Sequence, residues 1–355
     1  MALGPAAAFD KFVGENSEFV TRDRRRIPVF RGRQNLAELQ REDLRSLLAT
    51  IQSVFNERLA ERKRIPEHID DLPFYFDYID SDFSRAVAFR DDSYAFIGIT
   101  VPFIIELLEI CVRLSKSEPV RRLLGLGNTD EVREGLNVVL FQHLLSLVVT
   151  HEFTHHVHGH VLKHQSESNF FSEFTESNAN SKIERQAEEA DADGYAAYHV
   201  LANFIDSDTR KNISAALKLD SAAPAVVDQV LFSCFVIVAG AFLFSRRPVD
   251  LTKEDLFGLS HPPQAARLDY LIRHCMLWCK ENRPALEEWM TTERFQRIMK
   301  VVAEATWGIN GGLNWDAQTA FLRTERGETY FQQLSKLIDA HKAALRALAD
   351  ARASA

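Results

Sequence analysis

The segment His151-Glu152-Phe153-Thr154-His155 combines residue types that can bind a metal ion and move a proton. In an α-helix His151 and His155 lie one turn apart on one face, so both imidazoles can reach one ion, a spacing typical of zinc sites. Glu152 is then placed to take a proton from a water molecule as a general base. The apolar residues 138–149 predict a buried helix, in which these polar groups would be costly without a partner. The pattern therefore predicts zinc-assisted hydrolysis.

A catalytic zinc normally has three protein ligands and one open position, so a third ligand is needed. The metzincin spacing would require glycine at position 158 and histidine at position 161, but the chain has His158 and Val161 there. The remaining source is a carboxylate from a later helix. Residues 184–197 are rich in acidic side chains and predict such a helix.

Within this acidic stretch, Glu189-Ala190-Asp191-Ala192-Asp193 resembles the Glu-x-x-Ala-Asp helix of the HtpX-like and CAAX-prenyl-protease-like zinc metallopeptidases, a gluzincin family. In that family the leading Glu is the third zinc ligand and the Asp hydrogen-bonds a ligand histidine. The resemblance implies these roles for Glu189 and Asp193. Their spacing of one helical turn allows one carboxylate to face the metal and the other to orient an imidazole. Glu188 and Asp191 remain the competing ligands.

A second element, residues 260–268, resembles the Thr/Ser-His-Pro-Pro-x-x-x-Arg-Ile/Leu segment of the same family. The family's histidine steadies the tetrahedral intermediate, so the resemblance implies that His261 stabilises an oxyanion. The prolines that follow His261 are also typical of a helix N-terminus. We expect Arg267 to be structural and to pair with a nearby carboxylate.

A third, weaker match is the hairpin at residues 85–102, where Arg85 and Val87 replace the Asn and Phe of the family's Asn-Ala-Phe motif. The strand at 94–100 is expected to border the cleft and to accept an extended peptide at its edge. Members of the family often carry transmembrane helices before the zinc motif, and the sequence indicates none here. The soluble ImmA/IrrE-type regulatory peptidases, which have a similar acidic helix, are therefore an alternative relative.

Around these motifs the periodicity predicts strands at 74–79, 83–89 and 94–100, with a turn at 91–93. It predicts helices at 36–64, 102–114, 132–162 without interruption, 181–204, 228–245 and most of 262–349, and a loop at 165–180. This pattern indicates an α+β, mainly α-helical, zincin-type fold with a small antiparallel sheet. We expect a metallopeptidase domain at 71–275, flanked by helical extensions at 1–70 and 276–355.

The other histidines near the motif favour ordinary roles. His158 falls near the face of His151 and can line the cleft, whereas His156, His160 and His164 are interpreted as solvated or capping residues. His143 lies in the apolar part of the helix and is expected to be a hydrogen-bonded core residue.

The composition, 46% hydrophobic and 26% charged with a net charge of −8, is typical of a folded globular protein and disfavours nucleic acid as the main partner. Four irregularly spaced cysteines favour buried thiols in a reducing compartment. The N-terminus has no pattern of an export signal. The apolar segment 230–245 is shorter than the roughly 20 residues of a membrane span. A cytoplasmic location is expected, with membrane association through 230–245 as the alternative.

Together these features predict a zinc metallopeptidase, more specifically an endopeptidase that acts on a protein or peptide. One zinc ion would be held by His151, His155 and Glu189, with Glu152 as the general base. The alternative is a latent or non-catalytic zinc protein that uses its cleft to bind a partner.

Overall fold

The computed structural model describes residues 3–20, 26–61, 68–69, 72–164, 179–205, 209–245, 256–259, 261–308 and 310–353. The chain divides into two compact units. Unit 1 comprises Met1–Glu106, Glu152–Ser177 and Asp339–Ala355, and unit 2 comprises Leu107–His151 and Asn178–Ile338. One boundary falls inside a continuous helix, α5 (Asp130–Val157), between His151 and Glu152.

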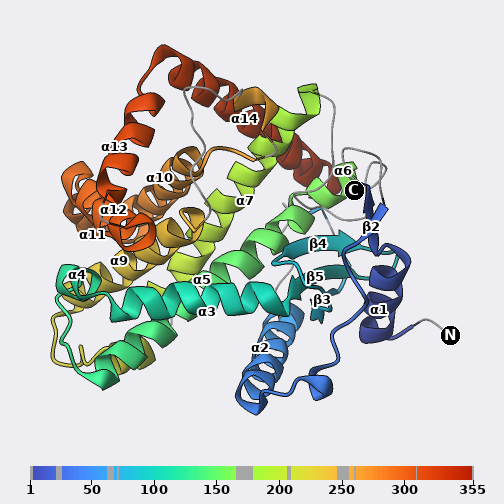
Figure 1. Ribbon diagram of the computed structural model, residues 1–355. Coiled ribbons are helices and arrows are strands. Elements are labelled where there is room, and N and C mark those ends of the chain that lie inside the picture. Colours follow the sequence, from blue (N-terminus) through green and yellow to red (C-terminus); the bar gives the residue numbers. More distant parts are fainter. Residues whose placement is uncertain are drawn as a thin grey trace. The chain divides into compact units, whose positions relative to one another are not determined.

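Unit 1 contains a three-stranded sheet of β3 (Phe74–Ile79), β4 (Ala86–Arg90) and β5 (Ala95–Thr100), in the order β3-β5-β4 (Figure 1). The three strands confirm the predicted ones within a few residues. The sheet is mixed, however, since β4 and β5 form an antiparallel hairpin while β3 and β5 are parallel. The prediction of an antiparallel sheet was therefore wrong. The reason is that β5 turns back between β4 and β3 and so runs in the direction of β3.

The position of β5 also corrects the predicted peptide-binding edge. Every residue of β5 is buried, and its main chain pairs with β3 on one side and β4 on the other. It therefore has no free edge to offer to a substrate. Among the described strands of this sheet, β3 and β4 are the outer ones, and β4 contacts α6 (His160–His164) through Ala88 and Val161.

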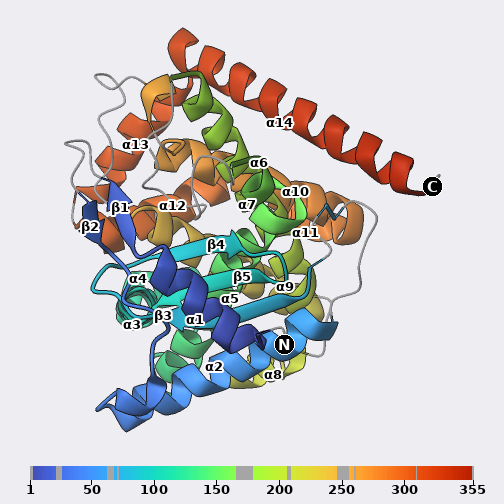
Figure 2. The same cartoon turned by 90° about the vertical axis from the view of Figure 1, so that its right-hand side faces the viewer.

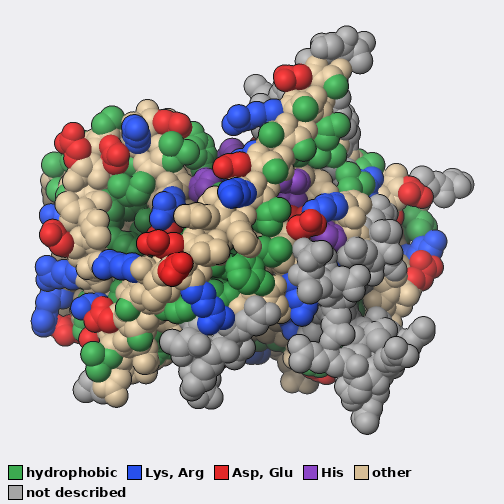
Figure 3. All heavy atoms as spheres, turned by 90° about the horizontal axis from the view of Figure 1, so that it is seen from above, with side chains coloured by type: hydrophobic (Ala, Val, Ile, Leu, Met, Phe, Trp, Pro, Cys, Tyr) green, Lys and Arg blue, Asp and Glu red, His purple; other side chains and the backbone are tan. Residues whose placement is uncertain are grey.

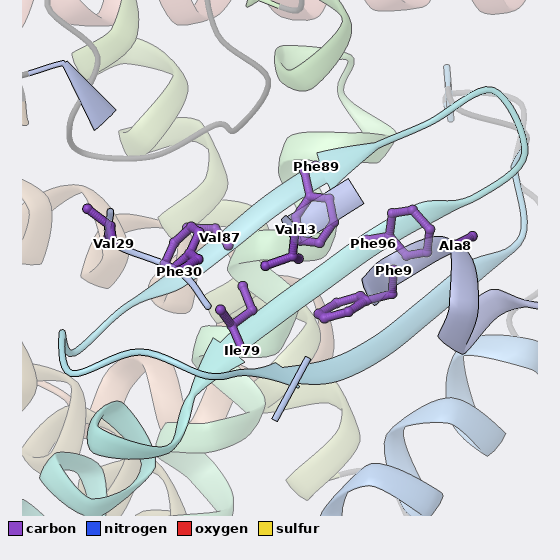
Figure 4. Close-up of a cluster of buried hydrophobic side chains, with 9 residues drawn as sticks. All are labelled: Ala8, Phe9, Val13, Val29, Phe30, Ile79, Val87, Phe89 and Phe96. Atoms are coloured by element: carbon purple, nitrogen blue, oxygen red, sulfur yellow. The ribbon is translucent and has the colours of Figure 1, made fainter. Parts of the chain in front are cut away.

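An aromatic cluster joins helix α1 (Pro5–Glu15) to the sheet. Phe9 of α1 packs against Phe89 and Phe96, with ring centroids 5.2 and 5.6 Å apart (Figure 4). Helix α2 (Glu42–Glu61), which begins six residues after the start of the predicted helix 36–64, contacts β3 (Figure 2). A short helix η1 (Leu36–Glu38) precedes α2, and β1 (Glu18–Val20) and β2 (Arg26–Pro28) form a separate antiparallel pair. These contacts give unit 1 a core centred on the sheet.

The rest of the described chain is helical, so the structure confirms an α+β, mainly helical fold, while the zincin type remains a prediction. The remaining elements are α3 (Val101–Lys116), α4 (Glu118–Leu123), α7 (Ala179–Ile205), α8 (Thr209–Ala216), α9 (Pro224–Leu243), η2 (Leu256–Gly258), α10 (Gln264–Asn282), α11 (Pro284–Trp289), α12 (Thr292–Trp307), α13 (Gly311–Leu322) and α14 (Glu325–Ala353). The four cysteines are buried and free, as expected.

Helix α9 is longer than the sequence suggested. It begins at Pro224 and continues through Asp228, so it has 20 residues and reaches the length of a membrane span. In the most apolar 18-residue stretch of α9, 78% of the residues are buried. The helix packs against α7, α10 and α12 within unit 2. Helix α5 also has the length and composition of a membrane span, and 61% of the residues in its most apolar 18-residue stretch are buried. A core helix and a membrane helix both have these properties.

The predicted uninterrupted helix at 132–162 is wrong. Helix α5 ends at Val157, and α6 begins at His160 after Gly159, whose φ of 75° is in the left-handed region that favours glycine. A side chain at this position would also meet Ile69 at 2.8 Å. The break redirects the chain directly after the histidine motif. The predicted loop at 165–180 lies outside the described residues as far as 178, and α7 starts at Ala179.

Candidate metal centre

The close packing of α7 on α10 within unit 2 positions the candidate carboxylates, Glu189 and Asp193, and Arg267. Gly194 lies at this contact, because a Cβ there would come within 2.7 Å of the His274 ring. The short distance between the helices brings Arg267 of α10 to Asp193, which precedes Gly194 on α7. Ser260, the first residue of the second motif, lies outside the described residues.

His151 and Glu189 face each other across α5 and α7, with Nε2 and Oε2 3.4 Å apart. This distance exceeds that of an N–H···O hydrogen bond, about 2.7–3.2 Å. It matches the separation of about 3.3 Å between two ligands that each lie about 2.0–2.1 Å from one tetrahedral zinc ion. The side chains are 12% and 11% exposed, so the pair is largely shielded from solvent.

His155 follows His151 by one turn on the same continuous helix, so helix geometry sets their relative position. His151, His155 and Glu189 form a group that could hold a metal ion. Two imidazoles and a carboxylate are also a usual donor set of catalytic zinc. The residues therefore fit the ion that the sequence predicts.

Asp193 links the histidine to an arginine. Its carboxylate lies 3.0 Å from His151 Nδ1 and accepts two hydrogen bonds from Arg267, at 2.7 and 2.8 Å. This confirms the expected pairing of Arg267 with a carboxylate. Burial alone would raise the pKa of Asp193, but the charge and hydrogen bonds of Arg267 and His151 outweigh it and lower that pKa below its usual value. Asp193 is therefore held ionised beside the ring nitrogen opposite Nε2.

The carboxylates of Glu189 and Asp193 favour a positive charge at His151. Burial alone would lower the pKa of His151, but its interactions with Asp193 and Glu189 raise it to about 10. A cation is thus stabilised between the two acidic side chains, whether it is a proton on the ring or a metal ion that replaces this proton.

His261 and Arg267 complete the surroundings of Glu189. His261 Nε2 is 3.7 Å and Arg267 Nη2 is 3.8 Å from Glu189 Oε2. His261 precedes the N-terminus of α10 and is 19% exposed, so it is near the predicted metal site and can be reached from solvent. The structure thus brings together His151, Glu189, Asp193 and His261.

The other predicted residues lie on the same two helices, α5 and α7. Glu152 is buried on α5 directly after His151, at 7% exposure. Glu188 and Asp191, the competing ligands, are also buried on α7. The carboxylate that faces His151 is that of Glu189.

Three histidines predicted to be solvated or capping are in fact buried: His156, His160 and His164. His156 Nε2 lies 2.9 Å from the carbonyl oxygen of Phe96 and so ties the end of α5 to the central strand. His160 is buried because the break at Gly159 turns it back toward α5. On the face of the molecule shown in Figure 3, histidine side chains appear only in small patches.

His143 is the core residue that the sequence predicts. Its Nδ1 lies 2.7 Å from the carbonyl oxygen of Val139, and its ring stacks on Phe204 at 4.0 Å. Burial lowers the pKa of His143 to about 4, so the ring is neutral at physiological pH. His143 therefore contributes to the packing of the apolar part of α5.

Sequence reasoning gave no role to His341, which lies on α14 and contacts His160. Nothing in the local sequence of α14 marks this residue, because the contact joins positions 181 residues apart.

The histidine motif, the acidic helix and His261 all lie in a part of the chain that resembles a known protein family. The model of the family Peptidase U49 matches residues 124–285, which include the histidine motif, the acidic helix and His261. This similarity supports a peptidase. Neither the curated proteins nor the solved structures gave a match.

Proposed function

We propose that this protein is a zinc-dependent peptidase, in which His151, His155 and Glu189 hold the ion. The observation that carries the proposal is the largely shielded pair of His151 and Glu189, whose 3.4 Å separation suits two ligands of one ion better than a hydrogen bond. The similarity of residues 124–285 to a family of peptidases supports the reaction class.

Each residue has a distinct task in this proposal. A bound zinc would polarise the scissile carbonyl and make a water molecule more acidic. Glu152 takes the proton from the attacking water and passes it to the leaving amine. His261 donates a hydrogen bond to the oxygen that becomes negatively charged. Asp193, fixed by two hydrogen bonds from Arg267, keeps the Nδ1 proton of His151 in place so that Nε2 is free for the metal.

The finer assignments belong to the same proposal. We infer an endopeptidase of the gluzincin type that acts on proteins or peptides in the cytoplasm. The basis is the resemblance of the acidic helix and the His261 segment to the HtpX-like and CAAX-prenyl-protease-like enzymes.

The test is metal analysis combined with proteolysis. Wild type and Glu152→Gln should each contain one zinc per chain, whereas His151→Ala and His155→Ala should lose it. Only wild type should cleave casein or a peptide library. Zinc in all four proteins, or in none, would refute the ligand assignment. Zinc with the expected losses but no cleavage by wild type would favour the alternative of a latent or partner-binding protein.

A further inference from the structure

A row of imidazoles continues from the second histidine of the motif, within unit 1. His155 is on α5, His160 is the first residue of α6, and His341 is on α14. His155 and His160 are almost completely buried, at 1% and 0% exposure. Three histidines from three helices thus lie in contact.

The contacts join specific ring nitrogens. His155 Nδ1 lies 2.9 Å from His160 Nδ1, and His160 Nε2 lies 3.2 Å from His341 Nε2. His341 Nε2 is also 3.0 Å from the main-chain oxygen of His158. Both nitrogen-to-nitrogen distances are compatible with N–H···N hydrogen bonds.

A metal ion bound by His155 would fix the position of the proton on each imidazole of this row. A neutral imidazole has one N–H, and a histidine that binds a metal through Nε2 carries its proton on Nδ1. His155 Nδ1–H must then donate to His160 Nδ1, which acts as an acceptor. The single proton of His160 is therefore on Nε2 and is donated to Nε2 of His341, which must be unprotonated, so the nearby main-chain oxygen of His158 receives no hydrogen bond from it.

We propose that His160 is a positioning residue that fixes the ring orientation and tautomer of the ligand His155, and that His341 of α14 holds His160 in place. This inference rests on the proposed function, in which His155 binds the metal. It gives His155 the support that Asp193 gives to His151, supplied here by a second histidine in place of a carboxylate.

The role of His160 depends on the chain reversal at Gly159. With φ at 75°, this residue ends the helix and lets α6 begin so that His160 returns to His155. The role of His341 depends on α14, whose residues from Asp339 onward belong to unit 1. The C-terminal helix is thereby coupled to the metal site through a hydrogen bond.

The experiment measures the Zn²⁺ affinity of the full-length protein by competition with a chelator. His160→Leu removes the acceptor and should weaken binding about 10-fold to 100-fold, the usual effect of losing the partner of a ligand histidine. His160→Asn keeps an acceptor oxygen at the position of Nδ1 and should restore most of the affinity. His341→Leu acts through His160 and should have a smaller effect. His199→Leu, a half-buried histidine on α7, is the control.

A structural role alone would affect His160→Leu and His160→Asn alike, and this result would overturn the proposal. So would His160→Leu binding Zn²⁺ as tightly as His199→Leu. Two-bond ¹H–¹⁵N correlation spectra of the Zn²⁺-loaded wild type give a measurement without substitution, and should show the His160 proton on Nε2. A proton on Nδ1 would refute the inference even if the leucine variant does not fold.

The same series separates this inference from the proposed function. If His155→Ala binds Zn²⁺ as tightly as wild type, the ligand assignment fails and the positioning role fails with it. If His151→Ala and His155→Ala lose the metal while His160→Leu keeps full affinity, only the positioning role is wrong.

Discussion

The most informative single substitution is Asp193→Asn, because it removes one charge from a buried network and leaves the shape of the side chain almost unchanged. Asp193 is 6% exposed, and Arg267, which donates two hydrogen bonds to it, is 14% exposed. Removing one partner of a buried ion pair typically costs about 3–5 kcal/mol, since the other charge remains buried without compensation. Asparagine can still accept one hydrogen bond, so we expect the lower value, about 3 kcal/mol.

The matched control is Asp269→Asn on α10. Asp269 pairs with the Nε of Arg273 at 2.7 Å, the same distance as that between Asp193 and the Nε of Arg267. Its pair is exposed, with side chains at 71% and 38%, so its removal should cost less than about 1 kcal/mol. The two substitutions therefore differ mainly in burial.

The assay is urea unfolding in the presence of a chelator, followed by Zn²⁺ titration of the same proteins. Asp193→Asn should also weaken Zn²⁺ binding about 10-fold to 100-fold, because Asp193 no longer fixes the tautomer of His151. A loss of stability no larger than that of Asp269→Asn would refute the burial reasoning. A large loss of stability with unchanged Zn²⁺ affinity would refute the link between Asp193 and the metal.

Three further outcomes are expected. Glu152→Gln should lower kcat by at least about 100-fold, as expected for loss of a general base, while Zn²⁺ affinity in the same preparation stays within a few-fold of wild type. The free energy of unfolding should fall by up to about 3 kcal/mol as pH decreases from 6.5 to about 4, because His143 binds a proton in the unfolded chain but is held neutral when folded. This contribution is fully present above pH 6.5, and unfolding of His143→Leu over this pH range should lack it. Gly135→Ala should destabilise the protein by about 1–3 kcal/mol in thermal or urea unfolding, because the new Cβ would lie 2.0 Å from the main-chain oxygen of Ala216. Gly14→Ala, which meets no atom within 4 Å, should be neutral or stabilising, and an equal loss in both variants would contradict the packing explanation.

Local sequence determined the elements that carry the chemistry. The spacing of His151 and His155 requires only a helix, and the apolar residues before them make that helix form and become buried. The alternation of the strand residues predicted β3, β4 and β5 nearly to their ends. These features depend on neighbours within a few positions, which is the range over which helix and strand periodicity acts.

Tertiary structure decided the pairings. The position of β5 between β3 and β4 depends on the path of the chain, which strand periodicity does not contain, and it removed the predicted peptide-binding edge. The burial of His160 depends on the break at Gly159, which helix periodicity does not contain, and the burial of His156 depends on the contact of α5 with β5.

The sequence by itself therefore determined which residue types are available for a metal site and the spacing of the first two. Only the folded chain decided that Glu189 faces His151, that Arg267 holds Asp193, and that His341 reaches His160. The physical reason is distance along the chain, since these contacts join residues 38 to 181 positions apart. Such contacts form only when helices distant in sequence pack together, as α7 packs on α10.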